Sequence, residues 1–230
     1  MIVAIDGPAG SGKSTVARAL SAARGLAYLD TGAMYRAVAD ACATRGVPVT
    51  DSEAVAGLAR SLDLDLIASE GGTRVIVDGA DRTAEIRNPE VDAIVSAVAA
   101  IPAVREVMVD RQRAIARGRS VVAEGRDIGT VVFPDAEVKV FLIADASARA
   151  HRRTVQRGGG DVASGRVVPT DAEQEARVAE ELVRRDEADS TRKTAPLIAA
   201  DDAITIDSTE LTVEEVCSKI CSLMDERSSR

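Results

Sequence analysis

The stretch IVAIDGPAGSGKST, residues 2–15, decides the fold expected of this chain. Residues 2–6 are almost wholly apolar, which is typical of a strand that is covered on both faces. Residues 7–14 match the pattern G-x-x-x-x-G-K-[ST] in full, and a helical segment at 13–24 follows. A strand, a glycine-rich loop and a helix in this order predict a phosphate-binding loop.

The residue types of this loop suit the chemistry of phosphate. Glycines let backbone N–H groups turn towards phosphate oxygens, and the N-terminus of the next helix favours an anion. Lys13 would reach the β- and γ-phosphates of a nucleoside triphosphate, and Ser14 would hold Mg²⁺ as the metal ligand. The residues expected to bind ATP here are Gly7, Pro8, Ala9, Gly10, Ser11, Gly12, Lys13, Ser14 and Thr15.

Four further apolar runs of strand length follow, and helical patterns separate them. The runs are residues 26–30, 120–124, 138–143 and 203–207. Asn88 before Pro89 predicts the start of a helix that runs to about 100, and Thr212 with Glu215 predicts a capping box. This alternation predicts an α/β chain with the P-loop NTPase fold, in which helices flank a five-stranded parallel sheet.

Two segments break the alternation. In residues 62–79 every second residue is apolar at first, EGGT at 70–73 reads as a turn, and RVIV follows, so we expect an antiparallel hairpin. We take residues 62–100 as a small α+β insert subdomain within one domain of residues 1–230. The glycines and arginines of RGGGDVASGRV, residues 157–167, predict a mobile loop.

Composition narrows the class of protein. The net charge is −8 and aromatic residues make up 2%, both of which argue against a nucleic-acid partner. The longest mainly apolar stretch, AIVSAVAAI, is too short to span a membrane, and the N-terminus lacks the pattern of a signal peptide. We therefore expect a cytoplasmic protein with no membrane partner.

The phosphate-binding loop alone leaves the reaction open. The N-K-x-D motif of GTPases is absent, and the strand at 120–124 ends in the single carboxylate Glu124 instead of the Asp-Glu pair of a motor protein. A small kinase is therefore favoured. Its acceptor site would lie where the strands end, near Arg36, near Arg126 with Asp127, and near the segment RRDEADSTRK, residues 184–193.

In that last segment, Arg185, Asp189 and Arg192 are spaced four and three residues apart, so one helix face can present all three. The same spacing also fits a solvated face of ion pairs.

The chain resembles the bacterial cytidylate kinases, which are P-loop nucleoside monophosphate kinases. The resemblance rests on IDGPAGSGKST, LDTGAMYRA, EIRNPEV, EGRDIGTVVFPDA and RRDEADSTRKTAPL, and it spans almost the whole chain. It implies transfer of the γ-phosphoryl group of ATP to CMP or dCMP, with Mg²⁺, in pyrimidine nucleotide metabolism. It also implies a monomer in which residues 62–100 bind the acceptor and residues 157–170 form a lid.

The resemblance also implies roles for individual residues. The acceptor phosphate would be surrounded by Thr31, Arg36, Arg126 and Arg192, and the sugar would be reached by Arg185 and Asp189. The cytosine would be read by Ser96, Arg105 and Asp127. The catalytic set would be Lys13, Arg36, Arg126 and Arg192, and the lid would bring Arg153 and Arg157 to ATP.

Base chemistry agrees with these roles, because a carboxylate at Asp127 can accept the exocyclic amine of cytosine while Arg105 serves the ring acceptors. Uracil would place a carbonyl against the carboxylate, and an unpaired buried group is costly.

Several alternatives stay open. Asp127 can also be a ligand of Mg²⁺, and any one of Arg152, Arg153 and Arg157 can be the lid arginine at the transferred phosphoryl group. Other acceptors, namely UMP, AMP or shikimate, remain possible, as does a regulatory protein that binds ATP without turnover.

Overall fold

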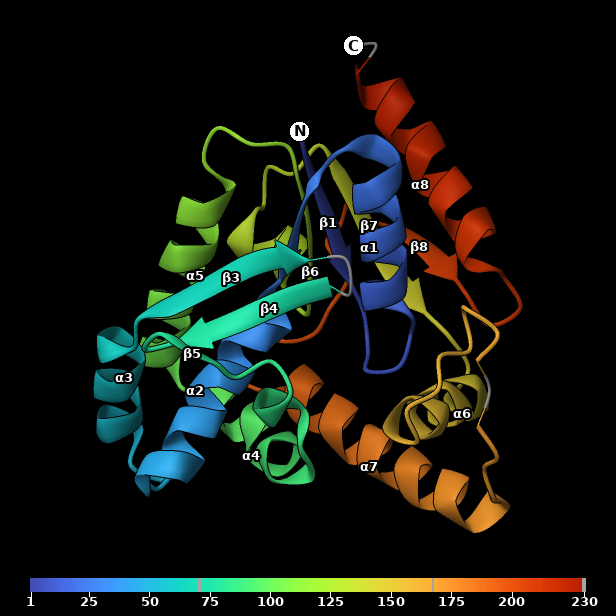
Figure 1. The fold of residues 1–230 in the computed structure, drawn as a ribbon. Helices are drawn as coiled ribbons and strands as arrows, with labels where there is room; N and C mark the ends of the chain where they lie inside the picture. Colours follow the sequence, from blue (N-terminus) through green and yellow to red (C-terminus); the bar gives the residue numbers. More distant parts are fainter. Residues whose placement is uncertain (70–71, 167, 229–230) are drawn as a thin grey trace.

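A five-stranded parallel sheet forms the centre of the molecule (Figure 1). The computed structural model describes residues 1–69, 72–166 and 168–228. The strand order is β2-β6-β1-β7-β8. The bounds are β1 (Ile2–Asp6), β2 (Ala27–Asp30), β6 (Val121–Gly125), β7 (Val138–Ile143) and β8 (Ile204–Asp207). All five predicted strands are confirmed to within one residue at each end, and with them the P-loop NTPase fold.

Helices cover both faces of the sheet, as the continuous apolar strands predict. Successive residues of β1 alternate between the faces: Val3 and Ile5 pack in one core and Ala4 in the other. The first core includes α1 (Lys13–Arg24) and α8 (Val213–Ser228). The second includes α2 (Thr31–Arg45), α3 (Ser52–Ser61), α4 (Pro89–Ala100) and α5 (Pro102–Ala116). The sheet is therefore a rigid base for the loops at its carboxyl edge.

The predicted helix starts are confirmed by their capping hydrogen bonds. The side chain of Asn88 accepts a hydrogen bond of 2.8 Å from the backbone N–H of Val91 at the start of α4. Thr212 and Glu215 form a reciprocal capping box before α8, with distances of 2.8 and 3.2 Å. Local sequence therefore sets where both helices begin.

A smaller antiparallel sheet lies between α3 and α4 in the chain. It consists of β3 (Leu64–Ser69), β4 (Gly72–Val77) and β5 (Ala80–Asp81), and the short helix η1 (Glu85–Arg87) follows. Glu70 and Gly71 of the predicted turn lie outside the described residues. Val75, Val77 and Ile86 belong to the same core as Ala4, so this segment packs directly on the main sheet. The division at 62–100 stays a prediction.

Two helices close the other end of the molecule. They are α6 (Ala146–Arg157) and α7 (Ala172–Thr191), which lie next to each other below the sheet in Figure 1. Between β6 and β7 the chain makes a π-helical turn, η2 (Ile128–Val132). Among the described residues, no helix has the length and apolar character needed to cross a bilayer.

Candidate active site

The phosphate-binding loop connects β1 to α1, and its first glycine approaches β7 closely. A Cβ built on Gly7 would lie 2.1 Å from the backbone oxygen of Leu142, and the φ angle of Gly7 is +148°. Gly12, with φ of +91°, turns the chain into α1. Both positions require glycine, because a side chain would either clash with the backbone or strain it. The loop conformation predicted from the sequence is thus built by contact with the sheet.

Lys13 is the first residue of α1 and is almost fully buried. Its Nζ donates a hydrogen bond of 2.7 Å to the backbone oxygen of Pro8, so the side chain curls back over the loop. Burial lowers the pKa of Lys13 to about 7, and the positive charge of Arg126 acts in the same direction. An anion bound here would restore the charge of this ammonium.

Glu124 is the last residue but one of β6, and it was not assigned a role from the sequence. It pairs in register with Ile5 of β1 and is buried. The hydroxyl of Tyr28 donates a hydrogen bond of 2.5 Å to its carboxylate, and the Ser14 side chain also hydrogen-bonds to it. Burial raises the pKa of Glu124, while the charge of Lys13 opposes that shift. Its place as the single carboxylate at the end of the apolar run 120–124 was the available signal.

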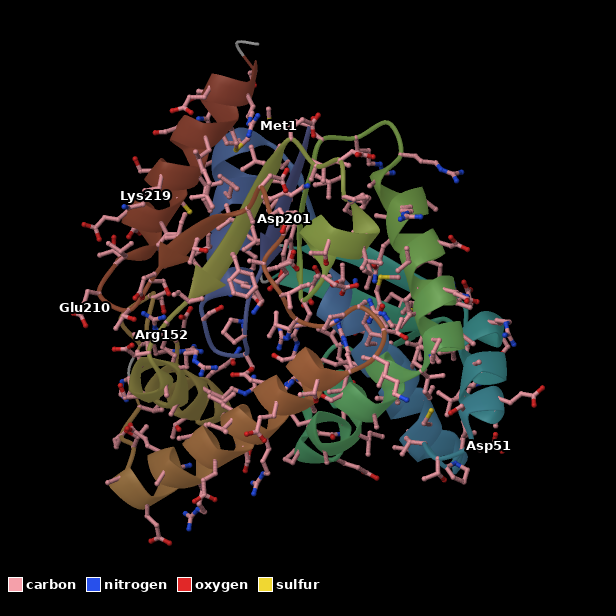
Figure 2. All side chains as sticks on the ribbon, turned by 180° about the vertical axis from the view of Figure 1, so that it is seen from behind. Met1, Asp51, Arg152, Asp201, Glu210 and Lys219 are labelled. Atoms are coloured by element: carbon pink, nitrogen blue, oxygen red, sulfur yellow. The ribbon has the colours of Figure 1, made fainter. Side chains whose placement is uncertain are left out.

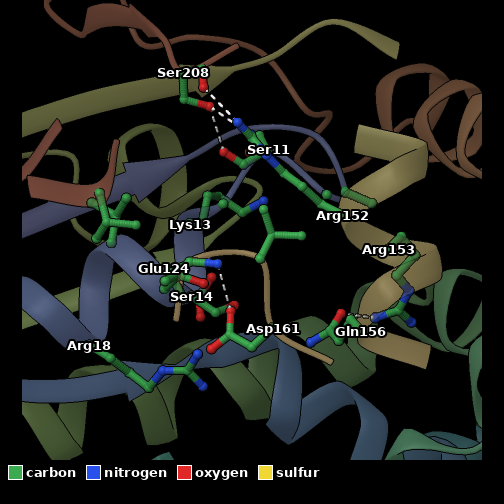
Figure 3. A pocket seen from close by; sticks show the side chains of 18 of the residues that line it. Ser11, Lys13, Ser14, Arg18, Glu124, Arg152, Arg153, Gln156, Asp161 and Ser208 are labelled. Atoms are coloured by element: carbon green, nitrogen blue, oxygen red, sulfur yellow. Dashed lines mark hydrogen bonds between the residues drawn. The ribbon is translucent and has the colours of Figure 1, made fainter. Parts of the chain in front are cut away.

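A cavity of about 1250 Å³ opens in front of the phosphate-binding loop. Figure 3 shows side chains from the loop, α1, β6 and α6 that line it. At one end it reaches residues 211–214 before and in α8, and at the other it reaches Arg36, Asp92, Arg126 and Arg185. Residues 160–163 of the predicted lid also line it. One cavity therefore borders the phosphate-binding loop, the predicted lid and these charged residues.

The three arginines that border the lid make different contacts. Arg152 donates to the backbone oxygens of Ser208 and Thr209 at 2.7 and 3.2 Å, and Figure 2 places it near the loop that carries Glu210. The Ser208 hydroxyl in turn donates to the backbone oxygen of Ser11 at 3.0 Å (Figure 3). Arg152 therefore ties α6 to the phosphate-binding loop. Arg153 and Arg157 point elsewhere, as described next.

Four arginines converge on one carboxylate, Asp92, and we call them the arginine cluster: Arg36 of α2, Arg153 and Arg157 of α6, and Arg185 of α7. Arg36 forms a close ion pair with Asp92, and Arg153 lies 2.7 Å from it. Burial works to raise the pKa of Asp92, but the charges of Arg36 and Arg153 outweigh it and hold the pKa below its usual range. No pattern in the sequence singles out Asp92.

A second buried group holds the residues assigned to base recognition. Arg105 and Asp127 form a close ion pair, and each is less than 5% exposed. Arg192 lies 3.6 Å from the other carboxylate oxygen of Asp127, and the guanidinium of Arg105 lies 5.4 Å from the centre of the Tyr35 ring. Tyr35 is a further residue of this group that the sequence left without a role.

The remaining predicted residues join the two groups. Arg126 donates from Nε to Asp189 at 2.9 Å, and the Ser96 hydroxyl lies 3.3 Å from the same carboxylate. Thr31 stands apart, since its hydroxyl donates to the backbone oxygen of Glu124 at 2.7 Å. The expectation that one helix presents Arg185, Asp189 and Arg192 is wrong: α7 ends at Thr191, and the backbone of Arg192 is extended. The helix stops because the chain turns back there: the backbone N–H of Leu197 donates a hydrogen bond of 2.9 Å to the backbone oxygen of Asp189.

Asp6, the last residue of β1, fixes the turn that carries Arg126 and Asp127. Its two carboxylate oxygens accept hydrogen bonds of 2.8 and 2.7 Å from the backbone N–H groups of Ile128 and Gly129. Burial raises the pKa of Asp6 to about 6 in spite of these two bonds. One buried side chain thus connects the start of the phosphate-binding loop to the turn of the base-recognition residues.

Comparison with known proteins agrees with this geometry. Residues 3–226 match the family model described as cytidylate kinase. The chain belongs to the cytidylate kinase family. A cytidylate kinase of Saccharophagus degradans is 45% identical over 99% of this chain and 98% of its own length. One of Pelotomaculum thermopropionicum is 48% identical over 95% and 93%. One of Streptomyces avermitilis is 43% identical over 99% and 94%. The family is thus matched along nearly the whole chain.

Proposed function

We propose that this chain transfers the γ-phosphoryl group of ATP to CMP or dCMP, giving ADP and CDP or dCDP. The observation that carries the proposal is the buried pair Arg105–Asp127. Arg126, the residue before Asp127, lines the cavity together with residues 9–15 and the arginine cluster. The named relatives support the same acceptor, since cytidylate is CMP. The pair provides the acceptor and donor that a cytosine edge needs.

The reaction needs no general base. A phosphate oxygen of CMP is already anionic at neutral pH; it forms a bond to the γ-phosphorus while the bond from that phosphorus to the β–γ bridging oxygen breaks, and ADP leaves. The protein contributes position and positive charge. We assign the charge to Lys13, Arg36, Arg126 and Arg192. Arg153 and Arg157 would reach the ATP phosphates as the lid, residues 157–170, closes and excludes water.

The residues at the loop fit a magnesium ion. The Ser14 hydroxyl and the Glu124 carboxylate supply oxygen atoms beside Lys13, and oxygen is the ligand type that Mg²⁺ prefers. We infer that Ser14 holds the ion and that Glu124 supports it. When bound, Mg²⁺ neutralises charge on the β- and γ-phosphates. Asp127 is already paired with Arg105 and Arg192, which favours its role in base recognition over metal binding.

The other finer assignments follow from the same arrangement. Ser96 would join Arg105 and Asp127 at the base, and Arg185 and Asp189 would contact the sugar. We keep residues 62–100 as the acceptor-binding segment, because α4 carries both Asp92 and Ser96 into the site. We also propose that the protein acts as a cytoplasmic monomer in pyrimidine nucleotide metabolism, binding small-molecule nucleotides.

The test is an assay of ADP release with ATP and Mg²⁺, in which CMP, dCMP, UMP and AMP are compared as acceptors. We expect CMP and dCMP to be preferred over UMP by a factor of about a hundred or more in kcat/KM. Asp127→Asn keeps the size of the side chain and adds a donor, so it should reduce that preference to roughly tenfold or less. No turnover with any of the four acceptors would reject the function.

Asp40→Asn is the matched control, since Asp40 is equally buried and accepts two hydrogen bonds of 2.8 Å from Arg82. Its partner is Arg82 and not Arg105 or Arg192, so its loss should lower stability and leave the CMP-to-UMP ratio unchanged. If both variants changed that ratio alike, or if UMP were used as well as CMP by the wild type, the role of Asp127 would be wrong.

A further inference from the structure

The arginine cluster places four guanidinium groups around one carboxylate. Arg153 donates to both oxygens of Asp92, at 3.1 and 2.7 Å, and Arg36 forms a close ion pair with it. Arg157 and Arg185 lie 3.6 and 3.7 Å away. These arginines come from three helices, so Asp92 on α4 is the point at which α2, α6 and α7 meet across the cavity.

Glu181 is a second carboxylate at the cluster and lies 2.7 Å from Arg157. Two carboxylates facing four arginines still leave the cluster with excess positive charge. Burial lowers the pKa of Arg185 to about 9, and the neighbouring charges of Arg126 and Arg36 lower it further. The buried Nε of Arg185 has no hydrogen-bond partner among the described residues. A donor without a partner beside crowded cations indicates that the cluster is built for an anion with more charge and more acceptor oxygens than Asp92 supplies.

The position of Asp92 in its helix does not explain the contact. An acidic residue in the first turn of a helix favours the helix dipole, and both Glu90 and Asp92 are in the first turn of α4. Glu90 has this position while remaining exposed, so the position does not require burial. The side chain of Asp92, in contrast, is only 12% exposed and is turned into the cavity lining. Its burial is accounted for by the arginines and not by the helix end.

We propose that Asp92 is a positioning residue of the phosphate site. It holds the arginine cluster together when no nucleotide is bound, and the nucleotide phosphates then displace it from the arginines. A carboxylate and a phosphate are interchangeable partners for a guanidinium fork, so the two compete for the same donors. The inference deepens the proposed function, on which it rests only for the identity of the phosphates.

Competition has a consequence that a purely structural ion pair lacks. Part of the attraction between the arginines and an incoming phosphate is offset, because the ion pairs with Asp92 must first be broken. Removing the charge of Asp92 should therefore weaken the ligand-free protein and at the same time strengthen anion binding. A side chain that only supports the fold would weaken the protein without tightening any anion.

The experiment is calorimetric titration of Asp92→Asn and wild type with inorganic triphosphate, together with thermal unfolding of both. We expect the variant to bind triphosphate about tenfold more tightly, which corresponds to about 1.4 kcal/mol. We also expect it to unfold at a lower temperature without triphosphate and to gain more from triphosphate than wild type does. Unchanged or weaker binding of triphosphate by Asp92→Asn would overturn the proposal.

Two further variants keep the result interpretable. Asp40→Asn loses a buried carboxylate paired with Arg82 and should unfold earlier with unchanged triphosphate affinity. Asp92→Ser is the second test variant if Asp92→Asn does not fold, and it should show the same tighter binding. If Asp92→Asn bound triphosphate more tightly but the wild type did not phosphorylate CMP, the role of Asp92 would stand and only the proposed acceptor would be rejected.

Discussion

Substitution of Asp6 by Asn should separate acceptor binding from donor binding. The carboxylate of Asp6 accepts from two successive backbone N–H groups, those of Ile128 and Gly129. An Asn side chain has one acceptor oxygen, so one N–H group would face an amide nitrogen and the turn would have to shift. Arg126 and Asp127 precede that turn directly, and small displacements of positioning residues cost up to about a hundredfold in rate.

The effect on stability should be small, and the reason can be worked out. Burial raises the pKa of Asp6 from 3.8 to about 6, so the ionised carboxylate costs about 3 kcal/mol at pH 8. Asn removes that cost but leaves a buried N–H group without its partner, which costs about 1–3 kcal/mol. The two terms nearly cancel at pH 8. Because this pKa is raised on folding, wild type should lose about 1 kcal/mol relative to Asp6→Asn between pH 5 and pH 8.

Steady-state kinetics and thermal unfolding test both statements. We expect kcat/KM for CMP to fall about 10- to 100-fold in Asp6→Asn, with the KM for ATP within about twofold of wild type. The melting temperatures at pH 8 should agree within about 4 °C. Equal losses for CMP and ATP, or an unchanged kcat/KM for CMP, would refute the positioning role of Asp6.

Three further predictions concern the phosphate-binding loop and the base-recognition group. Because the pKa of Lys13 is lowered to about 7, binding of ATP at pH 8 should take up about one proton, measured by calorimetry in buffers of different ionisation enthalpy. Between about pH 7 and 10.5 the Lys13 side chain binds more protons in the unfolded chain than in the folded one. This group therefore makes the free energy of unfolding rise with pH in that range. Gly7→Ala should abolish ATP-dependent turnover and lower the melting temperature by about 5 °C or more, because its Cβ meets the Leu142 backbone oxygen at 2.1 Å. Tyr35→Leu should raise the KM for CMP about threefold to tenfold and spare the KM for ATP, since it removes the ring beside Arg105.

A matched variant is available for Gly7→Ala, and each of the three predictions has an outcome that would contradict it. Gly57→Ala within α3 places a Cβ where nothing lies within 4 Å, so it should be neutral or slightly stabilising. Proton uptake at Lys13 should shrink towards zero at pH 6, and uptake that is equal at pH 6 and pH 8 would contradict the assignment. A Gly7→Ala protein with full activity would contradict the described loop. A Tyr35→Leu protein with equally raised KM values for both nucleotides would indicate a general loss of fold.

The fold could be predicted where local sequence sets the structure. Apolar runs gave the five strands, and the caps at Asn88 and Thr212 gave two helix starts. The helix at 52–61 escaped prediction because its buried face, Val55, Ala56 and Ala59, is small and short. The turn η2 escaped because Asp6, which accepts its first N–H groups, lies 122 residues away in the chain. Two-residue β5 is too short to show a pattern.

The residues of the candidate site could also be predicted only where a local sequence motif identifies them. Lys13 could be named from the phosphate-binding pattern, and Arg105 and Asp127 could be named from the resemblance to a known family. Asp92 and Glu124 could not, since their importance depends on partners that only the assembled helices and strands bring together. Thr31 was expected at the acceptor phosphate, yet its hydroxyl bonds to the backbone of Glu124. Sequence patterns indicate which residues lie at strand ends. Which hydrogen bonds and ion pairs these residues form depends on how the helices and strands pack.

The strand order has a consequence for how the protein is made. Among the strands that the structure describes, β1, which leads into the phosphate-binding loop, pairs only with β6 and β7, and β2 pairs only with β6. A ribosome has therefore released both β1 and β2 long before residues 121–125, the partner they share, have been synthesised. Until then the nascent chain exposes two apolar strands without sheet partners, which is the kind of surface that chaperones shield. Translation that stops before β6 should yield an aggregation-prone fragment that lacks a formed nucleotide site.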